Sequence, residues 1–120
     1  MDLNHPVVKL CLAGSQAEFE GRQEDACALY GQAWQAAQDD YGACIAAHYV
    51  ARCQKTPAET LRWNREALKR ADAAQDASVL EFYPSLYLNL GRSYELMGHP
   101  NEASQYYDLA ASLGAVHQPE

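Results

Sequence analysis

The sequence predicts an all-α protein built from pairs of helices. The composition has many alanines and few β-branched residues, which favours helix over sheet. Apolar residues recur every three or four positions, as expected for one buried face of each helix. Breaks such as Gly21 and Gly98-His99-Pro100 separate the helical stretches. A chain of 120 residues is long enough for one domain with a modest core.

Six helices are expected, each with a recognisable start or stop. Asn4-His5-Pro6 can cap the first helix. Proline stands at the first helical position after Thr56 and His99, where its missing N–H costs nothing. Glu59 and Glu102 follow three residues after Thr56 and His99, the spacing of a capping box. Gly114 suits a left-handed cap after the last helix. The expected ranges are 7–19, 23–38, 41–54, 57–76, 78–97 and 100–113, followed by a frayed tail over 115–120.

The start of the fifth helix has two interpretations. Ser78 and Glu81 offer a capping box, so we expect the helix to begin at Ser78 and to bend at Pro84, which removes one backbone donor. The alternative is a separate turn over these residues, with the helix proper beginning at Pro84. The fourth helix has no stop signal before Asp76, so we expect it to be unusually long.

The most informative stretch is Leu86 to Ala110. Its first helix has one face that carries Tyr87, Leu90-Gly91 and Tyr94. A second helix follows the Gly-His-Pro turn and carries Ala103 and Tyr107. Close packing of two helices needs small residues at the crossing point, so Gly91 is expected to face Ala103. This spacing resembles the helix-turn-helix unit of the tetratricopeptide repeat (TPR) family.

The same unit recurs twice in the chain. The pair Glu102-Ala103 matches Glu59-Thr60 and Asp25-Ala26, and Ala110 matches Ala67 and Ala33. The first spacing is 34 residues, the TPR period, and the second is 43, which adds nine residues between the last two units. The resemblance implies a right-handed α-solenoid in a single domain, with units over residues 7–40, 41–77 and 78–114.

The middle unit departs from the pattern at His48. This position holds Gly14 and Gly91 in the other units. Thr60 replaces the alanine that is expected opposite, and Asn64 replaces the ring of Tyr30 or Tyr107, so total volume is roughly kept. One interpretation is a satisfied polar core in which His48 bonds Thr60 or Asn64. The other is a polar pocket or a pH-sensitive joint formed by His48, Thr60 and Asn64.

Several function classes are disfavoured by composition and motifs. The formal net charge of −7 opposes general nucleic-acid binding. The first twenty residues lack the pattern of a signal peptide and no stretch is long enough to span a membrane, so a cytoplasmic location is expected. No phosphate loop, dinucleotide fingerprint, nucleophile elbow or HExxH motif is present, and we expect no enzyme activity and no cofactor.

The cysteines do not suggest a metal site or a disulfide framework. There is no CxxC pair, and Cys44 with His48 supplies at most two of the four ligands that zinc needs. We expect no bound metal. Because an export signal is missing, we expect all four cysteines to be reduced and to serve as packing residues. The four cysteines are Cys11, Cys27, Cys44 and Cys53.

The resemblance implies a protein–protein interaction module. In TPR proteins the first helices of successive units line a concave groove, which would hold a peptide or helix of a partner protein. The negative net charge favours a basic partner. Tyr and Arg are common hot-spot residues, so Tyr49, Arg52 and Arg92 are the leading candidates. Carried over residue by residue, the groove comprises Ser15, Ile45, Tyr49, Arg52, Leu88, Asn89 and Arg92, with Cys11, Glu18 and Glu95 in the same rows and Phe19 at an edge.

The alternative function is self-association as a structural protein. TPR arrays often end in an extra solvating helix, and this chain stops after the sixth. Tyr106, Leu109 and Leu113 are then uncovered, and a contiguous apolar surface of this kind favours burial against a second copy as a homodimer.

Overall fold

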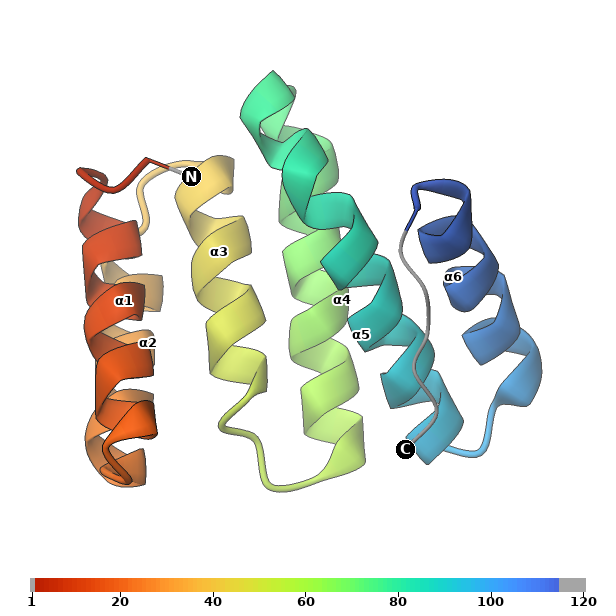
Figure 1. Ribbon diagram of the computed structural model, residues 1–120, viewed down its shortest axis with the longest axis horizontal. Coiled ribbons are helices and arrows are strands. Elements are labelled where there is room, and N and C mark those ends of the chain that lie inside the picture. Colours follow the sequence, from red (N-terminus) through yellow and green to blue (C-terminus); the bar gives the residue numbers. More distant parts are fainter. Residues whose placement is uncertain (1, 115–120) are drawn as a thin grey trace.

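A computed structural model of the chain describes residues 2–114 (Figure 1). All regular structure in this range is helical and no strand occurs in it, which confirms the all-α class. None of the helices in the described range is long and apolar enough to cross a membrane. The expected tail over 115–120 lies outside the described residues. The elements are α1 (Pro6–Phe19), α2 (Gln23–Ala36), α3 (Asp40–Ala51), α4 (Pro57–Ala74), the 3₁₀ helix η1 (Ala77–Phe82), α5 (Tyr83–Leu96) and α6 (Pro100–Ser112).

Consecutive helices pack in pairs. The most extensive packing joins α1 to α2, α3 to α4 and α5 to α6, and the pairs meet through α2 with α3 and through α4 with α5. Figure 1 shows α2 and α4 behind α1 and α3. The molecule measures 20 Å along its shortest axis, which is about the thickness of two helices.

The helix starts follow from local capping. His5 Nδ1 accepts a hydrogen bond from the Val7 amide at 3.1 Å, and Thr56 Oγ1 accepts one from the Glu59 amide at 3.2 Å. The Thr56 hydroxyl also donates to the Glu59 carboxylate at 3.0 Å, so the capping pair forms by a side-chain contact. Each cap satisfies a backbone donor that the helix itself leaves without an acceptor.

The fifth helix does not begin at Ser78. Instead α4 ends at Ala74, Gln75 takes the left-handed conformation (φ 49°), and the Asp76 carboxylate accepts from the Ser78 amide at 2.9 Å to start η1. The α-helix begins at Tyr83, one residue before the position given by the alternative interpretation. Pro84 explains the break, because in the first turn of a helix its missing N–H costs no hydrogen bond, whereas further inside it would. The expected long fourth helix is present, with 18 residues.

The helix pairs of the first and third units are packed by the same two residue types. A Cβ atom added to Gly14 would lie 2.7 Å from Cδ1 of Tyr30, and one added to Gly91 would lie 2.7 Å from Cδ1 of Tyr107. Gly91 therefore lies against the Tyr107 ring, one turn beyond the expected Ala103. The ring needs the space that a methyl group would occupy, which explains why both positions are glycine.

The buried residues form two clusters. One contains residues of α1, α2 and α3, with Tyr30 as its largest fully buried side chain. The other joins α3 and α4 to η1 and α5. Trp34, Tyr41 and Phe82 pack against both clusters and so connect them. The two junctions between helix pairs consequently differ in chemistry, and this difference defines the candidate site.

Candidate functional site

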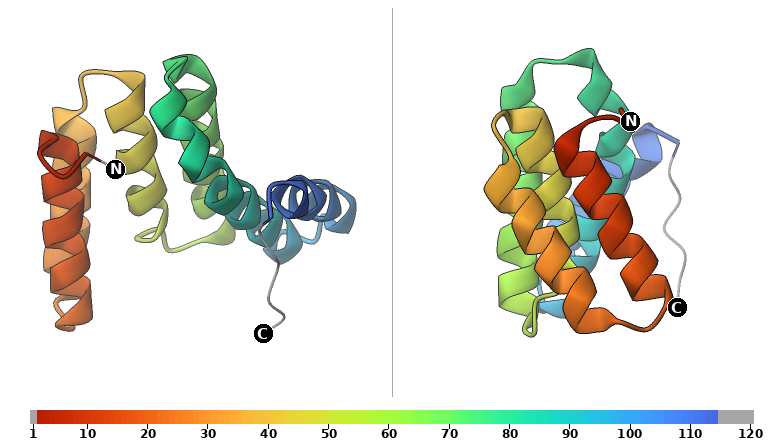
Figure 2. Two further views of the ribbon diagram at one scale, coloured as in Figure 1. Left: turned by 45° about the horizontal axis from the view of Figure 1, so that its top comes forward. Right: turned by 90° about the vertical axis from the view of Figure 1, so that its left-hand side faces the viewer.

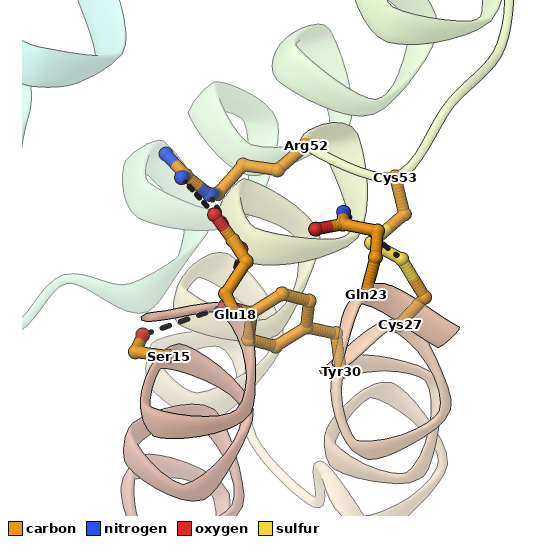
Figure 3. Close-up of polar contacts among 7 residues, drawn as sticks. All are labelled: Ser15, Glu18, Gln23, Cys27, Tyr30, Arg52 and Cys53. Carbon is orange, nitrogen blue, oxygen red and sulfur yellow. Dashed lines mark hydrogen bonds and ion pairs between the residues drawn. A yellow bond between two sulfur atoms is a disulfide. The ribbon is translucent and has the colours of Figure 1, made fainter. Parts of the chain in front are cut away.

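The first junction contains a network of polar side chains around Glu18. Tyr30 donates its hydroxyl hydrogen to Glu18 Oε1 at 2.8 Å, and Ser15 Oγ lies 3.4 Å from the same hydroxyl (Figure 3). Arg52, from the end of α3, donates to both carboxylate oxygens of Glu18, with Nε at 3.2 Å from Oε1. Tyr49 stacks on the Tyr30 ring at 5.1 Å between centroids. We call these five residues the Glu18 cluster.

The charges in the Glu18 cluster stabilise one another. The hydrogen bond from Arg52 is the main cause that lowers the pKa of the Glu18 carboxyl below its ordinary value, and the Tyr30 bond adds to it. Burial is the main cause that raises the pKa of the Tyr30 hydroxyl, so this group remains a donor at neutral pH. The Arg52 side chain is 53% exposed while that of Glu18 is 22% exposed, so the guanidinium presents its outer edge to solvent.

A disulfide lies beside this network. Cys27 of α2 and Cys53, just after α3, are joined, with their Cα atoms 5.8 Å apart (Figure 3). The Gln23 amide contacts Cys27 Sγ at 3.7 Å. The expectation that all four cysteines are reduced packing residues is therefore wrong for this pair. Disulfides are rare in the cytosol of most organisms, so the bond also weighs against the expected cytoplasmic location.

The other two cysteines are free and buried. Burial raises the pKa of the Cys11 and Cys44 thiols to about 12, with a smaller contribution from Asp72 at Cys44. Both thiols are protonated at neutral pH and are weak nucleophiles in this environment. Within the described part of the chain, no three His, Cys, Asp or Glu side chains are grouped closely enough to hold a metal ion.

The second junction contains two amide contacts and a hydrogen bond from the Tyr83 hydroxyl of α5 to the Asp72 carboxylate of α4 at 2.6 Å. The Asn89 amide nitrogen of α5 lies 3.2 Å from His48 Nδ1, and the Asn64 amide donates to Ser93 Oγ of α5 at 2.9 Å. Thr60 instead donates to the Thr56 carbonyl, within its own helix. The expected hydrogen bond of His48 to Thr60 or Asn64 is therefore replaced by bonds to the next unit.

An apolar cavity of about 150 Å³ lies between α3, η1 and α5. Ile45 and Leu86 are buried in its wall, and the Phe82 ring lines it from η1. His48 and Tyr49 border it from α3. We call it the His48 cavity. Helix α1 packs directly on α3, whereas α5 diverges from α3 and packs on α6 and α4 (Figure 2), so the cavity is left between α3, η1 and the start of α5.

The expected groove residues fall into three environments. Ser15, Tyr49 and Arg52 come together in the Glu18 cluster, and Asn89 contacts His48. Ile45 is only 5% exposed and belongs to the core, although it reaches the cavity wall. On α5, Leu88 is half-buried and Arg92 is exposed. Of the further positions, Cys11 is buried and Phe19 is 88% exposed.

Three features of the site were not expected from the sequence. The Cys27–Cys53 bond has no CxxC signal, and the two residues meet only because α2 lies beside the end of α3. Tyr30 was expected to be a packing residue, yet its hydroxyl bonds Glu18. The residues of η1 line the cavity because the nine extra residues fold back over α3.

Comparison with known proteins adds no assignment to this geometry. No family model matches the chain, and no curated protein or solved structure matches it. Functional inference therefore depends on the arrangement of the side chains described above.

Proposed function

We propose that this protein is a three-unit TPR-like solenoid that binds a peptide or helix of a partner protein on the face formed by α1, α3 and α5. The repeated Gly–Tyr contact, at Gly14 with Tyr30 and at Gly91 with Tyr107, supports the repeat architecture. Tyr30 and Tyr107 also bond Glu18 and Glu95 at 2.8 and 2.9 Å, again at equivalent positions. Two units therefore share a glycine, a tyrosine and a glutamate in the same geometry.

The observation that carries the binding proposal is the Glu18 cluster. It holds Tyr49 and Arg52, the residue types that dominate interface energetics, in fixed positions next to an apolar cavity. The contacts to Glu18 and Tyr30 restrict both side chains before a partner arrives, so less conformational entropy is lost on binding. Arg92 extends the charged part of the surface along α5.

Selection from a random peptide library tests this proposal. Peptides are selected on the wild-type protein, and their affinities are measured by calorimetry for Arg52→Ala/Arg92→Ala and for Arg62→Ala/Arg65→Ala. The second variant removes two exposed arginines from α4 and is matched in charge. We expect at least a tenfold loss for the first variant and none for the second. Failure to select any peptide, or equal losses in both variants, would contradict the proposal.

A second candidate function is self-association through α6. Leu109 is 44% exposed and Leu113 is 53% exposed, and they lie one helical turn apart, so they form an apolar patch. Tyr106 is more covered, since it stacks on Tyr94 at 5.6 Å between centroids. Light scattering on the eluting protein would detect the dimer, and Leu109→Glu should dissociate it, whereas Leu12→Glu on α1 should not. A single species near 13.3 kDa at all concentrations tested would exclude self-association.

A further inference from the structure

Helix α4 carries an exposed row of three cations. Arg62, Arg65 and Lys69 follow one another at spacings of three and four residues, so they lie along one helical face over about 10 Å. None of the three forms an ion pair with another residue in the range 2–114. Four of the nine Lys and Arg residues of the chain lie on this helix, although the formal net charge of the chain is −7. We call these three residues the α4 row.

The acidic residues of α4 are engaged elsewhere. Glu66 lies 2.7 Å from Nε of Arg70 and is paired with that guanidinium. Glu59 accepts a hydrogen bond from the hydroxyl that caps α4, and the Asp72 carboxylate accepts one from a tyrosine hydroxyl of α5. At physiological salt, charges more than about 8 Å away are largely screened. The α4 row is therefore a local positive surface on an acidic protein.

Arg65 has one further ionisable neighbour, the hydroxyl of Tyr106 on α6. Burial is the main cause that raises the pKa of Tyr106 above its ordinary value, and Arg65 opposes this shift. The hydroxyl is consequently uncharged at neutral pH. It leaves the positive charge of Arg65 available to an anionic group of another molecule.

A hollow lined by two tryptophans lies beside the α4 row. It has a volume of about 290 Å³, and its walls include Trp34 of α2 and Trp63 of α4 together with Arg62 and Lys69. The two indole rings meet edge to face at 5.0 Å between centroids, and the Arg70 guanidinium lies 5.5 Å from the centre of the Trp34 ring. Both rings are half-buried, so each keeps an exposed part. The hollow therefore offers aromatic surface to an apolar group that has carboxylates beside it.

The spacing of the cations favours a helical occupant. Successive members of the α4 row are separated by about 4.5 and 6 Å along the helix axis. Carboxylates at i, i+4 and i+7 of a second, antiparallel helix have the same intervals, whereas alternate side chains of an extended strand are about 6.6–6.8 Å apart. A long polyanion such as nucleic acid extends beyond the row and meets the negative charge of the rest of the chain.

We infer that the α4 row and the tryptophan hollow bind an acidic helix of a partner protein. Carboxylates one turn apart pair with Arg62, Arg65 and Lys69, and an apolar side chain next to them contacts Trp63. Exposed ion pairs are individually weak, so several of them act together with the tryptophan contact. Helix α4 lies behind α3 (Figure 1) and outside the face formed by α1, α3 and α5, so this surface is separate from the proposed groove.

A designed peptide helix tests the inference. The probe is an alanine-based helix of about 18 residues without tryptophan, with Glu at i, i+4 and i+7 and Leu at i+3. Its binding to the full chain is measured by the anisotropy of a fluorescein label. Unlabelled peptide reports contact with the hollow through tryptophan emission, because Trp34 and Trp63 are the only tryptophans of the chain. We expect saturable binding and a change in this emission. Absence of saturable binding, or binding without the emission change, would overturn the inference.

Matched variants locate the contact. Arg62→Gln/Arg65→Gln should weaken the binding at least threefold, because two exposed ion pairs are lost. Lys9→Gln/Arg92→Gln removes two exposed cations from α1 and α5 and should leave the affinity unchanged. A peptide of the same composition, with its three Glu residues distributed around the helix, should bind at least threefold more weakly. Equal losses in the two variants, or equal affinities of the two peptides, would overturn the assignment to the α4 row.

A single-stranded oligonucleotide tests the other class of acidic partner. At physiological salt it should bind more weakly than the peptide, because the net charge of −7 opposes an extended polyanion. Tighter binding of the oligonucleotide, weakened by Arg62→Gln/Arg65→Gln, would assign the surface to nucleic acid and overturn the protein partner.

Discussion

The amide nitrogen of Asn89 lies 3.2 Å from Nδ1 of His48, so the side chain that orients this histidine comes from α5 and not from its own helix pair. The contact fixes the ring between the second and third helix pairs. Because the ring is held in its neutral form, protonation affects the junction between these pairs directly.

Acid should weaken the fold through His48. Its folded-state pKa lies below the ordinary value of 6.5, so the unfolded chain binds the proton more readily. The free energy of unfolding should therefore be unaffected by this group above about pH 6.5 and fall as the pH drops below that value. Urea denaturation at several pH values checks this. His48→Asn should remove the slope, while His99→Asn, in the exposed loop before α6, should keep it.

His48 and Glu18 affect the free energy of unfolding in different pH intervals. The pKa of Glu18 is lowered from an ordinary 4.5, so this carboxyl costs stability only as the pH falls below about 4.5. Parallel curves for wild type and His48→Asn between about pH 5 and 7 would contradict the assignment to His48.

A methyl group at Gly91 should destabilise the protein. The added Cβ would lie 2.6 Å from Cε1 of Tyr107, which is closer than packed atoms tolerate, so Gly91→Ala should cost about 1–3 kcal/mol. Gly31→Ala is the matched control, because nothing lies within 4 Å of the added atom and helix propensity predicts a gain of about 0.5–1 kcal/mol. Urea midpoints measure both, and equal effects at the two glycines would show that the Tyr107 contact is not tight.

Reduction of the disulfide should lower stability. The bond closes a loop between residues 26 positions apart, which corresponds to about 2–4 kcal/mol. At roughly 4 °C per kcal/mol for a domain of this size, the melting temperature should fall by about 8–16 °C on addition of dithiothreitol. Cys27→Ser/Cys53→Ser should melt at the reduced value and not respond to the reductant. Thiol titration of the denatured wild type should detect only Cys11 and Cys44 before reduction.

The tyrosine–glutamate bonds of the first and third units should differ in strength. Tyr30 is 1% exposed and bonds a half-buried carboxylate, so Tyr30→Phe should cost about 1.5–3 kcal/mol. Glu95 is exposed, so Tyr107→Phe should cost about 0.5–1.5 kcal/mol. Chemical denaturation of the two variants gives the comparison directly. A larger loss for Tyr107→Phe would show that burial does not control these bonds.

The helices could be predicted from the sequence because their signals are local. Pro57 and Pro100 each begin a helix at the expected position, and α1 begins at Pro6, one residue before the expected start, since proline is tolerated in the first turn. The residues between α4 and α5 were harder to assign. Asp76 and Ser78 both have capping side chains, and which one acts depends on how η1 packs over α3, a non-local contact.

The candidate site was predicted only in part, because it depends on which helices touch. Gly14 and Gly91, which the sequence pattern matches, each lie against a tyrosine ring, but the pattern does not say whether His48 reaches α4 or α5. The Cys27–Cys53 bond similarly needs the distance between α2 and the end of α3. Sequence spacing predicts the contacts within one helix pair. The polar contacts and the disulfide of the candidate site, by contrast, join side chains of different helix pairs.

The covalent link between the first two helix pairs has a mechanical consequence. If the protein is pulled by its two ends, the segment from Cys27 to Cys53, whose ends are 26 positions apart, cannot extend, and the stretched chain is shorter by about 90 Å than the reduced chain. Helix α1 and the helices after Cys53 lie outside this loop and bear the force without such a tether. Tension should therefore separate the outer helices first. Removal of α1 from α3 breaks the Glu18 cluster, and removal of α5 and α6 from α4 opens the His48 cavity, while the disulfide keeps α2 and α3 together.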